Sequence, residues 1–469
     1  MKACSPPPAP RVFFWSLAVE GNPADLGRVA GAGLFATPED GVGCLSMQNQ
    51  TVIVGGGAGG LELAARLGRR LGPLEGPRRV LLIDRAIFHL WKPSLHEVAA
   101  GSLDSRQEGL DYLMLARRNH FRFVLGEVEG LDPVARRLRL AETRDVDGSL
   151  LIEARSMDFE RLVLAIGAGS HLFDTPGAAE HACMLEDVAD AEAFHRRLAA
   201  LFLSSAYDGR RLLRIAIVGA GATGVELATE LLEGHAVLSA ALDPTERFTL
   251  EVTIAEAAPR ILGGLSEAVA DKAARALRAR GVKLAVGARV TRVRADGLET
   301  SVGEIPADLI VWAAGVQAAD INRTFGLATG RLNQFIVDDR LRASAPGVYA
   351  IGDCAEAPGP EGQAVPARAQ AASQEAAYLA RALTRPGDPG PFQYHDRGAL
   401  ISLGPDHGLG SLMGGLVGPD FLIEGLLARW AYMALHLQHH RVVVGLRRTI
   451  LLALSRLAHR RVSGRLKLH

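Results

Sequence analysis

The chain has 469 residues, which at roughly 150 residues per domain is enough for about three domains. Hydrophobic residues make up 48% and charged residues 22% of the sequence, so a large core is available and disorder is not expected. Lysine plus arginine and aspartate plus glutamate both number 52, and this neutral balance gives no reason to expect a nucleic-acid partner. The cysteines are far apart in the sequence (Cys4, Cys44, Cys183 and Cys354), so we expect no metal site and a reducing cytoplasm.

Residues 1–46 are rich in proline, glycine and alanine, with one short apolar run at Val12–Leu17. This run is too short for the apolar core of a signal peptide, and no clear cleavage site follows it. No run of about 18 apolar residues occurs in the chain, so we expect no membrane-spanning helix. We interpret residues 1–46 as a disordered extension, with a targeting role as the alternative.

A first dinucleotide-binding unit begins directly after this extension. The apolar, β-branched run Thr51–Val54 leads into the glycine turn Gly55–Gly60, and a helical pattern follows over Leu61–Leu71. A second buried strand, Arg79–Ile83, ends in Asp84. The order strand, glycine turn, helix, strand, acid predicts a βαβ unit.

The same order recurs later in the chain. The strand Arg214–Val218 leads into the turn Gly219–Gly224 and the helix Val225–Leu232, and a further strand, Leu250–Ala255, ends in Glu256. Other apolar runs predict strands at 121–140, 162–166, 282–286, 309–314 and 348–351, and helices at 187–204, 272–280 and 368–383.

A GxGxxG turn lets the backbone approach a pyrophosphate, and the helix that follows points its free amides at that anion. One such turn is a weak signal, but two complete units make coincidence improbable. The glycines assigned to cofactor binding are Gly55, Gly57 and Gly60 in the first turn, and Gly219, Gly221 and Gly224 in the second. The sequence therefore predicts an α/β fold with two Rossmann-like domains, one for FAD and one for NADH.

The N-terminal unit is assigned to FAD, with Asp84 hydrogen-bonded to a ribose hydroxyl. Gly167, which follows the strand at 162–166, adds a glycine turn to this site. Asp353, in the Gly-Asp pair after the strand at 348–351, is expected to bind the ribityl chain of the flavin. An ordinary strand-ending turn is the alternative for Asp353.

The second unit is assigned to the nicotinamide dinucleotide. Glu256 favours NADH, because a carboxylate repels the 2′-phosphate of NADPH, although Arg260 nearby is a cationic exception. Glu226 follows Gly224 by two residues, and a helix there would bring its carboxylate near the nicotinamide and flavin rings. We predict a catalytic role for Glu226, with electrostatic stabilisation of the helix start as the alternative.

The electron acceptor is indicated by a missing motif and by the C-terminal region. The segment His89–Glu97 contains no cysteine pair, which excludes thiol–disulfide chemistry there and leaves a quinone as a fitting acceptor.

Between Phe421 and His469 the sequence has nine lysine and arginine residues but a single acid, Glu424. Apolar residues at helical spacing from Leu422 to Leu437, and again around Val442–Val444 and Ile450–Leu454, predict amphipathic helices on an anionic membrane surface. Packing on the protein's own core or on a twin subunit is the alternative.

Several longer segments resemble those of bacterial type II NADH dehydrogenases, the single-subunit, non-proton-pumping NADH:quinone oxidoreductases. The segments are His89–Asp104, Gly219–Leu227, Val311–Gly315, Tyr349–Ala355 and Arg465–His469, and the resemblance extends over Thr51–His469.

The resemblance implies roles for particular residues and partners. The family's AQxAxQ signature falls on Ala369–Gln374, which implies that Gln370 and Gln374 act catalytically at the quinone; by pattern alone these are solvent-facing helix residues. Lys92 is implied to bind the cofactor. The resemblance also implies a homodimer at the cytoplasmic face of the bacterial inner membrane, where it passes electrons to the quinone of the respiratory chain. The segment 1–46 has no counterpart, and either His395 or Arg397 would take the place of a base near the acceptor.

These observations predict that the NADH domain is inserted in the FAD domain. The expected parts are residues 47–175 and 331–410 for FAD, 176–330 for NADH, and 411–469 for a membrane-associated region. The alternatives are a ferredoxin reductase-like enzyme, a sulfide:quinone oxidoreductase, and a flavin-bearing NADH sensor with little turnover.

Overall fold

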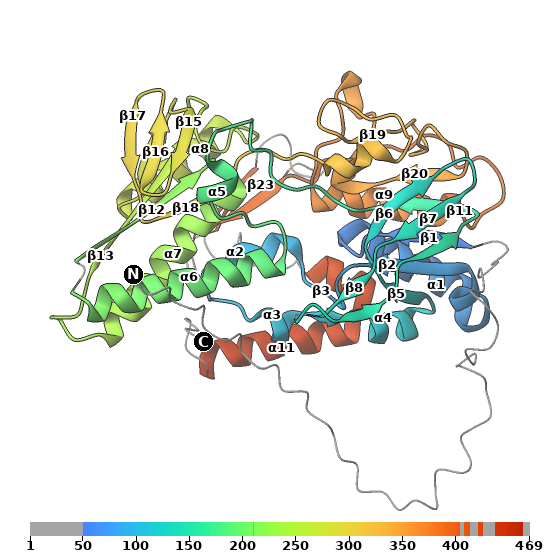
Figure 1. Cartoon of the computed structure of the whole chain (residues 1–469), viewed down its shortest axis with the longest axis horizontal. Coiled ribbons are helices and arrows are strands. Elements are labelled where there is room, and N and C mark those ends of the chain that lie inside the picture. The colour runs from blue at the N-terminus through green and yellow to red at the C-terminus, as the bar shows by residue number, and fades with distance from the viewer. Residues whose placement is uncertain are drawn as a thin grey trace, which may run out of the picture. The chain divides into compact units, whose positions relative to one another are not determined.

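The computed structural model describes residues 50–145, 147–209, 211–403, 408–412, 421–424 and 437–462 (Figure 1). The expected disordered extension, residues 1–46, lies outside the described residues.

The first unit is built on a parallel five-stranded sheet in the order β20-β11-β1-β2-β5. Its strands are β1 (Thr51–Val54), β2 (Val80–Asp84), β5 (Arg122–Leu125), β11 (Arg161–Leu164) and β20 (Val348–Ala350). All four residues of β1 are buried, as expected for the central strand of a parallel sheet covered on both faces.

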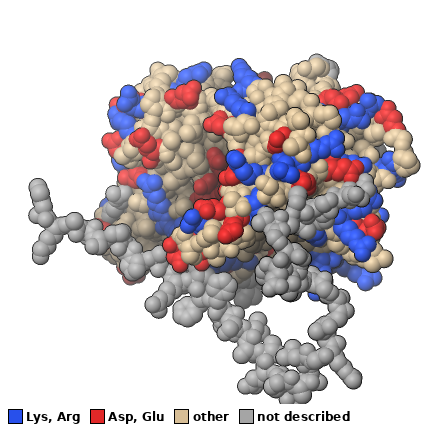
Figure 2. Space-filling view, turned by 45° about the vertical axis from the view of Figure 1, so that its right-hand side comes forward, with Lys and Arg blue, Asp and Glu red and all other residues tan. Residues whose placement is uncertain are grey.

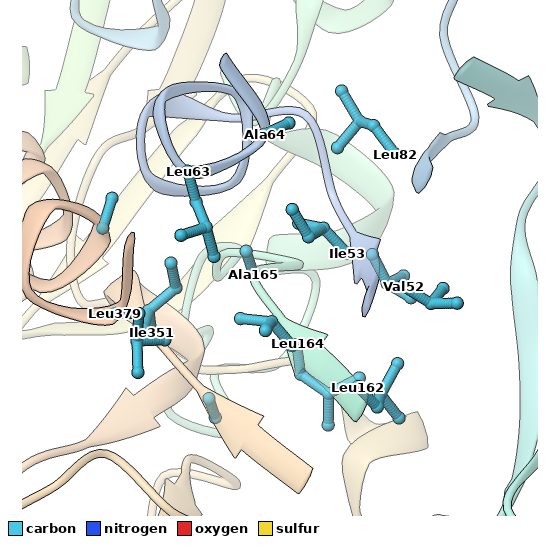
Figure 3. Close-up of a cluster of buried hydrophobic side chains, with 14 of the residues drawn as sticks. Val52, Ile53, Leu63, Ala64, Leu82, Leu162, Leu164, Ala165, Ile351 and Leu379 are labelled. Atoms are coloured by element: carbon cyan, nitrogen blue, oxygen red, sulfur yellow. The ribbon is translucent and has the colours of Figure 1, made fainter. Parts of the chain in front are cut away.

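Two helices pack against each other beside this sheet, α1 (Ala58–Arg79) and α9 (Ala369–Ala382). Figure 3 shows Leu63 of α1 and Leu379 of α9 directed toward side chains of the sheet, among them Ile53. Burying one such side chain stabilises the fold by about 1.5–3 kcal/mol relative to its exposure. The α1 range exceeds the predicted helix because a second helical stretch continues beyond Gly72, which has a φ of +80°.

The second unit has a parallel four-stranded sheet in the order β14-β13-β12-β18. Its strands are β12 (Leu212–Val218), β13 (Thr249–Glu256), β14 (Lys283–Val286) and β18 (Leu309–Trp312). The helices of this unit are α6 (Val188–Tyr207), α7 (Ala222–Ala241) and α8 (Glu267–Ala279). In both sheets the strand before the glycine turn is central, with the acid-bearing strand on one side.

The order of strands also explains the domain arrangement. β11 and β20 are neighbours in the first sheet, yet the whole second sheet lies between them in sequence. The second unit is therefore inserted in the first, as the sequence predicts. Each unit also carries a three-stranded antiparallel sheet: β6 (Val128–Asp132), β7 (Arg137–Leu140) and β10 (Arg155–Asp158) in the first, and β15 (Val290–Arg294), β16 (Gly297–Thr300) and β17 (Gly303–Pro306) in the second.

Shorter elements follow β2, namely β3 (Phe88–His89), a 3-10 turn at Lys92–Ser94, α2 (Leu95–Ala99), α3 (Ser105–Glu108), β4 (Leu110–Asp111) and α4 (Tyr112–Asn119). The helix α2 packs against α6 and α7 of the second unit, so this segment joins the two units. Figure 2 shows acidic and basic side chains intermixed over the face in view, in keeping with their equal totals.

The C-terminal region differs from the sequence prediction in its first part. Phe421–Glu424, expected to begin an amphipathic helix, is strand β24, which pairs antiparallel with β23 (Gly408–Leu412), itself paired with β22 (Ala399–Ser402). The aromatic and β-branched residues of this stretch suit a strand, and pairing with β23 supplies the backbone hydrogen bonds that decide between the two conformations. The rest of the expected helix, residues 425–436, lies outside the described residues.

Two helical stretches follow, residues 437–444 and α11 (Leu446–Val462), separated at Gly445 with a φ of +79°. Val443 and Val444 are 0% and 5% exposed and belong to the core of the first unit. The expectation that the apolar patch Val442–Val444 faces a membrane is therefore wrong for these two side chains, because they pack on the protein's own core. Among the α11 side chains that the structure describes, residues 446–455, four large apolar ones are exposed, namely Leu446, Ile450, Leu451 and Leu454.

Candidate dinucleotide and acceptor sites

The three assigned glycines of the first loop differ in the space around them. Gly55 has a φ of +100°, and a Cβ there would collide with the carbonyl of Ala165. A Cβ on Gly60 would collide with the carbonyl of Gly55, so this glycine allows α1 to start close against the end of β1. A Cβ on Gly57 would meet nothing within 4 Å. This open side lies at the N-terminus of α1, where a pyrophosphate can approach the backbone amides.

The second glycine loop repeats this pattern position by position. Gly219 has a φ of +103°, and its Cβ would lie 2.7 Å from the carbonyl oxygen of Ala313. A Cβ on Gly224 would collide with the carbonyl of Gly219, whereas one on Gly221 would meet nothing within 4 Å. Both turns are therefore shaped to bring backbone close to an anion at a helix N-terminus.

The two acids at the strand ends bind their own glycine loops in the same way. The Asp84 carboxylate accepts from the amides of Gly56, at 2.5 Å, and Ala86, at 2.8 Å. The Glu256 carboxylate accepts from the amides of Ala220 and Ala258, both at 2.8 Å. Burial raises the pKa of Asp84, although the amides of Ala86 and Gly56 oppose the shift. Each acid thus lies beside its own glycine loop.

The remaining first-site residues follow neighbouring strands of the first sheet. Gly167 follows β11 and Asp353 follows β20, so both lie at the same carboxyl edge as the loop after β1. Lys92 Nζ donates to the carbonyl of Ala168 at 2.7 Å. Burial raises the pKa of Asp353, and the charge of Lys92 opposes this shift. The structure therefore brings Gly167, Lys92 and Asp353 together around the end of the sheet, where ligands bind in open α/β folds.

Glu375 is a site residue that the sequence pattern does not reveal. Its side chain is 2% exposed, and its Oε2 accepts from the amide of Gly352 at 2.6 Å. Burial raises the pKa of Glu375 to about 7, with a further contribution from Asp353. The turn after β20 is thereby fixed from α9, and no local pattern marks this glutamate among the other residues of that helix.

Glu226 lies where α2, α7 and β22 meet. Its Oε1 accepts from the amide of Ser402 at 3.0 Å, and its Oε2 lies 3.6 Å from Nδ1 of His96. Burial raises the pKa of Glu226, and His96 opposes the shift. Electrostatic stabilisation of a helix start requires neither this burial nor partners on other elements. His96 is a second residue that sequence reasoning missed as a site residue.

Gln370 and Gln374 lie on one side of α9, as their spacing predicts, and both bind the segment 395–398. Gln374 donates to the carbonyl of His395 at 2.9 Å and accepts from the His395 amide at 3.1 Å. Gln370 donates to the Asp396 carboxylate and the Gly398 carbonyl and accepts from the amide of Arg397. Both side chains therefore position the loop that carries His395 and Arg397.

The two described cysteines are poor nucleophiles. Cys354 is buried, its thiol donates to the carbonyls of Leu164 and Ile351, and burial raises its pKa to about 12. Burial also raises the pKa of Cys183, although Arg197 opposes the shift. A thiolate at either position is disfavoured near neutral pH. Among the described residues, no group of three or more histidine, cysteine, aspartate or glutamate side chains is placed to hold a metal ion.

Two glycine loops of matching geometry, one in an inserted unit, define an oxidoreductase of the two-dinucleotide class. The pyridine nucleotide-disulphide oxidoreductase family matches this chain over residues 49–376. The type II NADH:quinone oxidoreductase of Haemophilus influenzae is 36% identical over 442 residues, which cover 89% of this chain and 99% of that protein. The Mycobacterium tuberculosis type II NADH:quinone oxidoreductase Ndh is 28% identical over 418 residues, 84% of each chain.

A solved structure shares the fold. NDH2 from Plasmodium falciparum in complex with NADH superposes with a TM-score of 0.70 at 16% identity, covering 83% of this chain and 94% of that one. The chain belongs to the pyridine nucleotide-disulphide oxidoreductase family, among its type II NADH:quinone oxidoreductases.

Proposed function

We propose that this chain is an NADH:quinone oxidoreductase that binds FAD at the first glycine loop and NADH at the second. The observation that carries the proposal is the repetition of one loop geometry in two units, each with an open glycine, Gly57 or Gly221, at a helix N-terminus. FAD held at the first loop would supply the two-electron chemistry, accepting hydride from NADH and giving electrons to a quinone. The protein binds and orients the partners.

The residues of the first site fit FAD in their chemistry. The loop amides at the start of α1 suit the pyrophosphate, and Asp84 suits a ribose hydroxyl. Asp353 is partly buried at the same sheet edge, where its carboxylate suits a polyhydroxyl chain. Lys92 and Gly167 complete this edge.

The residues of the second site fit NADH. Glu256 lies at the end of β13 beside the second loop, and its charge disfavours a 2′-phosphate. Arg260 is directed elsewhere, because its guanidinium donates to the carbonyls of Leu265 and Gly263. This engagement of Arg260 removes the one residue of the sequence that argued for NADPH. Glu226 orients the reacting end of the dinucleotide.

The quinone is proposed to bind beside the segment 395–398. Gln370 and Gln374 hold this segment by bonds to its backbone, and Arg368 Nη1 lies 3.2 Å from the Asp396 carboxylate. The glutamines thus position His395 and Arg397 beside α9 instead of presenting unpaired amides. The high pKa of the Cys354 thiol favours a quinone over a disulfide as the acceptor.

A membrane surface is the proposed location, with α11 and α4 facing the lipid. An apolar groove of about 540 Å³ lies between these helices, lined in part by Met114, Leu115, Leu451 and Leu452. Leu113 and Met114 of α4 are 63% and 64% exposed, so the apolar surface extends beyond the tail.

Cationic side chains border the same groove. Arg118 and Arg448 both line it, and Arg118 Nη1 is buried without a hydrogen-bond partner among the described residues. Burial lowers the pKa of Arg118, and the charge of Arg448 adds to this shift, so the pair suits an anionic headgroup. Within the described part of the chain, no helix is long and apolar enough to cross a bilayer. Attachment at the cytoplasmic face of the inner membrane and a homodimer complete the proposal.

The cofactor assignment is tested on the purified protein before any acceptor is added. The flavin released on denaturation is identified by chromatography, and the bound flavin is titrated anaerobically with NADH and with NADPH. The proposal expects FAD, with bleaching of its absorbance by NADH at lower concentrations than by NADPH. Absence of flavin, or a flavin that NADH does not reduce, contradicts it.

A further inference from the structure

A buried chain of hydrogen bonds joins the C-terminal segment, residues 437–444, to the first glycine loop. His439 Nδ1 lies 3.0 Å from Glu62 Oε1, and His439 Nε2 lies 3.0 Å from His89 Nε2. His89 Nδ1 lies 2.9 Å from the carbonyl oxygen of Gly56, inside the glycine turn. We name these three side chains the His439–Glu62–His89 relay.

The relay is shielded from water. Glu62, His439 and His89 are 1%, 2% and 4% exposed, so their hydrogen bonds must be satisfied within the protein. Burying such groups lowers the stability of the fold unless they are paired. The proposed hydride transfer uses none of the three, so it does not explain why they are buried together.

To make all three of its contacts hydrogen bonds, the relay requires one more proton than two neutral imidazoles and a carboxylate provide. Its three hydrogen bonds, Glu62–His439, His439–His89 and His89–Gly56, each need one proton. A neutral imidazole carries one N–H, so two histidines supply two protons, and the Gly56 carbonyl and the Glu62 carboxylate only accept. The third proton makes either an imidazolium beside a carboxylate or two neutral imidazoles beside a carboxylic acid.

The contacts around Glu62 favour its carboxylate form, which leaves the extra proton on the imidazole side of the relay. Burial acts to raise the pKa of Glu62, but the hydrogen bond and charge of His439, with Arg66 and Ser373, outweigh it and hold that pKa below its usual value. Arg66 and Ser373 both bind Glu62 Oε2, at 3.0 and 2.8 Å. The ring of Trp91 lies 4.3 Å from that of His439 at an interplanar angle of 31°, an arrangement that favours a cation.

The groups around His89 keep it neutral. Burial lowers the pKa of His89 well below its usual value, and the charges of His439 and His440 add to this, against the bond to Gly56. The Tyr112 hydroxyl donates to the same Gly56 carbonyl at 2.7 Å, and burial beside Asp84 raises the pKa of that hydroxyl well above its usual value. The extra proton therefore decides whether His89 Nε2 accepts from His439. Only when it accepts there can the single N–H of neutral His89 donate from Nδ1 to the Gly56 carbonyl.

The C-terminal segment is held in place beside the relay. Arg69 donates to the carbonyl of Val442 at 2.6 Å, and Asn119 donates to that of Val443 at 3.0 Å. Both donors satisfy carbonyls at the end of a helix, which otherwise lack partners. His439 thus reaches the first unit from a segment docked on that unit.

We propose that His439 is a positioning residue for the first glycine loop, and that one proton held by the His439–Glu62–His89 relay controls how tightly this loop retains FAD. With the proton present, His439 donates to His89, and His89 donates to the Gly56 carbonyl. Without the proton, two lone pairs face each other at one of the three contacts, and that hydrogen bond is lost. The proposal rests on the assignment of FAD to the first loop.

The direction of the pH dependence follows from this count. The relay is complete while its extra proton is bound and breaks as rising pH removes that proton. FAD retention therefore falls with rising pH. Losing one neutral hydrogen bond to the loop raises the FAD dissociation constant about five- to tenfold.

One substitution removes the need for the extra proton while it keeps the hydrogen bonds of the relay. In Glu62→Gln, the amide oxygen can accept from Ser373 and Arg66, while the amide nitrogen donates to His439 Nδ1. His439 then donates to His89, and His89 to Gly56, with no extra proton. This variant is expected to keep FAD at wild-type affinity and to lose the pH dependence.

The test measures the FAD dissociation constant of the purified full-length protein from about pH 6 to about pH 9, across the range in which histidines titrate. The measurement compares the wild-type protein with Glu62→Gln, His439→Phe and Gln438→Ala. Gln438 is an exposed neighbour on the same helix and serves as the control. Circular dichroism confirms that each variant folds.

We expect His439→Phe to bind FAD about five- to tenfold more weakly at neutral pH, Gln438→Ala to match wild type, and Glu62→Gln to be flat where wild type weakens. If His439→Phe retains FAD like wild type, or Glu62→Gln shows the wild-type pH dependence, the proposal is overturned. If the wild-type protein binds no FAD, this result contradicts the proposed function. It then also contradicts the role of the relay, which rests on that function.

Discussion

Nδ1 of His96 lies 3.6 Å from Oε2 of Glu226, and both side chains are buried. His96 belongs to α2, in the segment that follows the first dinucleotide unit, whereas Glu226 belongs to the helix that opens the second. The contact therefore joins the proposed FAD and NADH sites through their own elements.

Glu226→Gln keeps the size of the side chain and can keep both partners, but it removes the negative charge. We expect NADH to reduce the bound flavin about tenfold more slowly, as measured by stopped-flow absorbance, with the FAD content unchanged. Burial raises the pKa of Glu226, so its charge is costly and the substitution is not expected to lower the free energy of unfolding. Glu230→Gln, one turn along α7, is the matched control. A wild-type rate of flavin reduction in Glu226→Gln would exclude a catalytic role.

Glu256→Gln is predicted to weaken the preference for NADH. The two Glu256 oxygens accept from the amides of Ala220 and Ala258, and a glutamine can accept only one of them. We expect a higher KM for NADH, and a fall of about tenfold in the ratio of kcat/KM for NADH over NADPH, because the charge that repels a 2′-phosphate is gone.

The matched control is Glu251→Gln, on the same strand, where the carboxylate pairs with Lys283. An unchanged ratio in Glu256→Gln would show that its charge does not select the dinucleotide.

Glu375 predicts a pH-dependent stability. Its pKa is raised from 4.5 to about 7, so its contribution is fully present below 4.5 and is lost as pH rises through 7. Glu375→Gln keeps an acceptor for the Gly352 amide without the ionisation. Its free energy of unfolding should exceed that of wild type at about pH 8 by up to about 3 kcal/mol, and by little at about pH 5. Urea unfolding measures this, with exposed Glu153→Gln as the control; parallel pH profiles for wild type and Glu375→Gln contradict it.

The sequence predicts the parts of this fold that depend on local pattern. The strand Thr51–Val54 is β1 residue for residue, and Asp84 ends β2 as expected. The glycine turns are recognisable because the three spaced glycines and the acid at the next strand end all fall within one βαβ unit. The insertion of the second unit also follows, because the Gly-Asp turn at 352–353 returns to the first.

Contacts distant in sequence could not be predicted. Phe421–Glu424 has an apolar pattern that fits a helix, and only pairing with β23 makes it a strand. Glu62 and His439 lie 377 residues apart, so neither shows a partner locally. The AQxAxQ match predicted that Gln370 and Gln374 share a side of α9, but not that segment 395–398 occupies both amides.

Gln374→Ala and Gln370→Ala are predicted to impair the quinone side alone. Loss of either side chain frees the backbone around His395 and Arg397. We expect kcat/KM for the quinone to fall about tenfold in each variant, while flavin reduction by NADH stays at the wild-type rate. Arg381→Gln, exposed near the end of α9, serves as the control. Equal losses in both half-reactions would instead indicate a general effect on folding or on FAD.

Membrane binding is predicted to depend on α4 as well as on α11. Ile450→Glu with Leu451→Glu in α11, and Leu113→Glu in α4, place charges on exposed apolar positions. Each of these two variant proteins should bind anionic vesicles at least about tenfold more weakly in a sedimentation assay. Leu74→Glu, at an exposed leucine of α1, is the control. Wild-type binding by Leu113→Glu would restrict the membrane surface to the tail.

The most direct test of the account is the reoxidation of the NADH-reduced flavin by a quinone. The bound flavin is bleached with NADH under anaerobic conditions, a short-chain quinone is added, and both the flavin spectrum and steady NADH consumption are followed. The account predicts that quinone restores the oxidised spectrum and sustains turnover, with one quinone reduced per NADH oxidised. Bleaching by NADH without quinone-dependent reoxidation and turnover would contradict it.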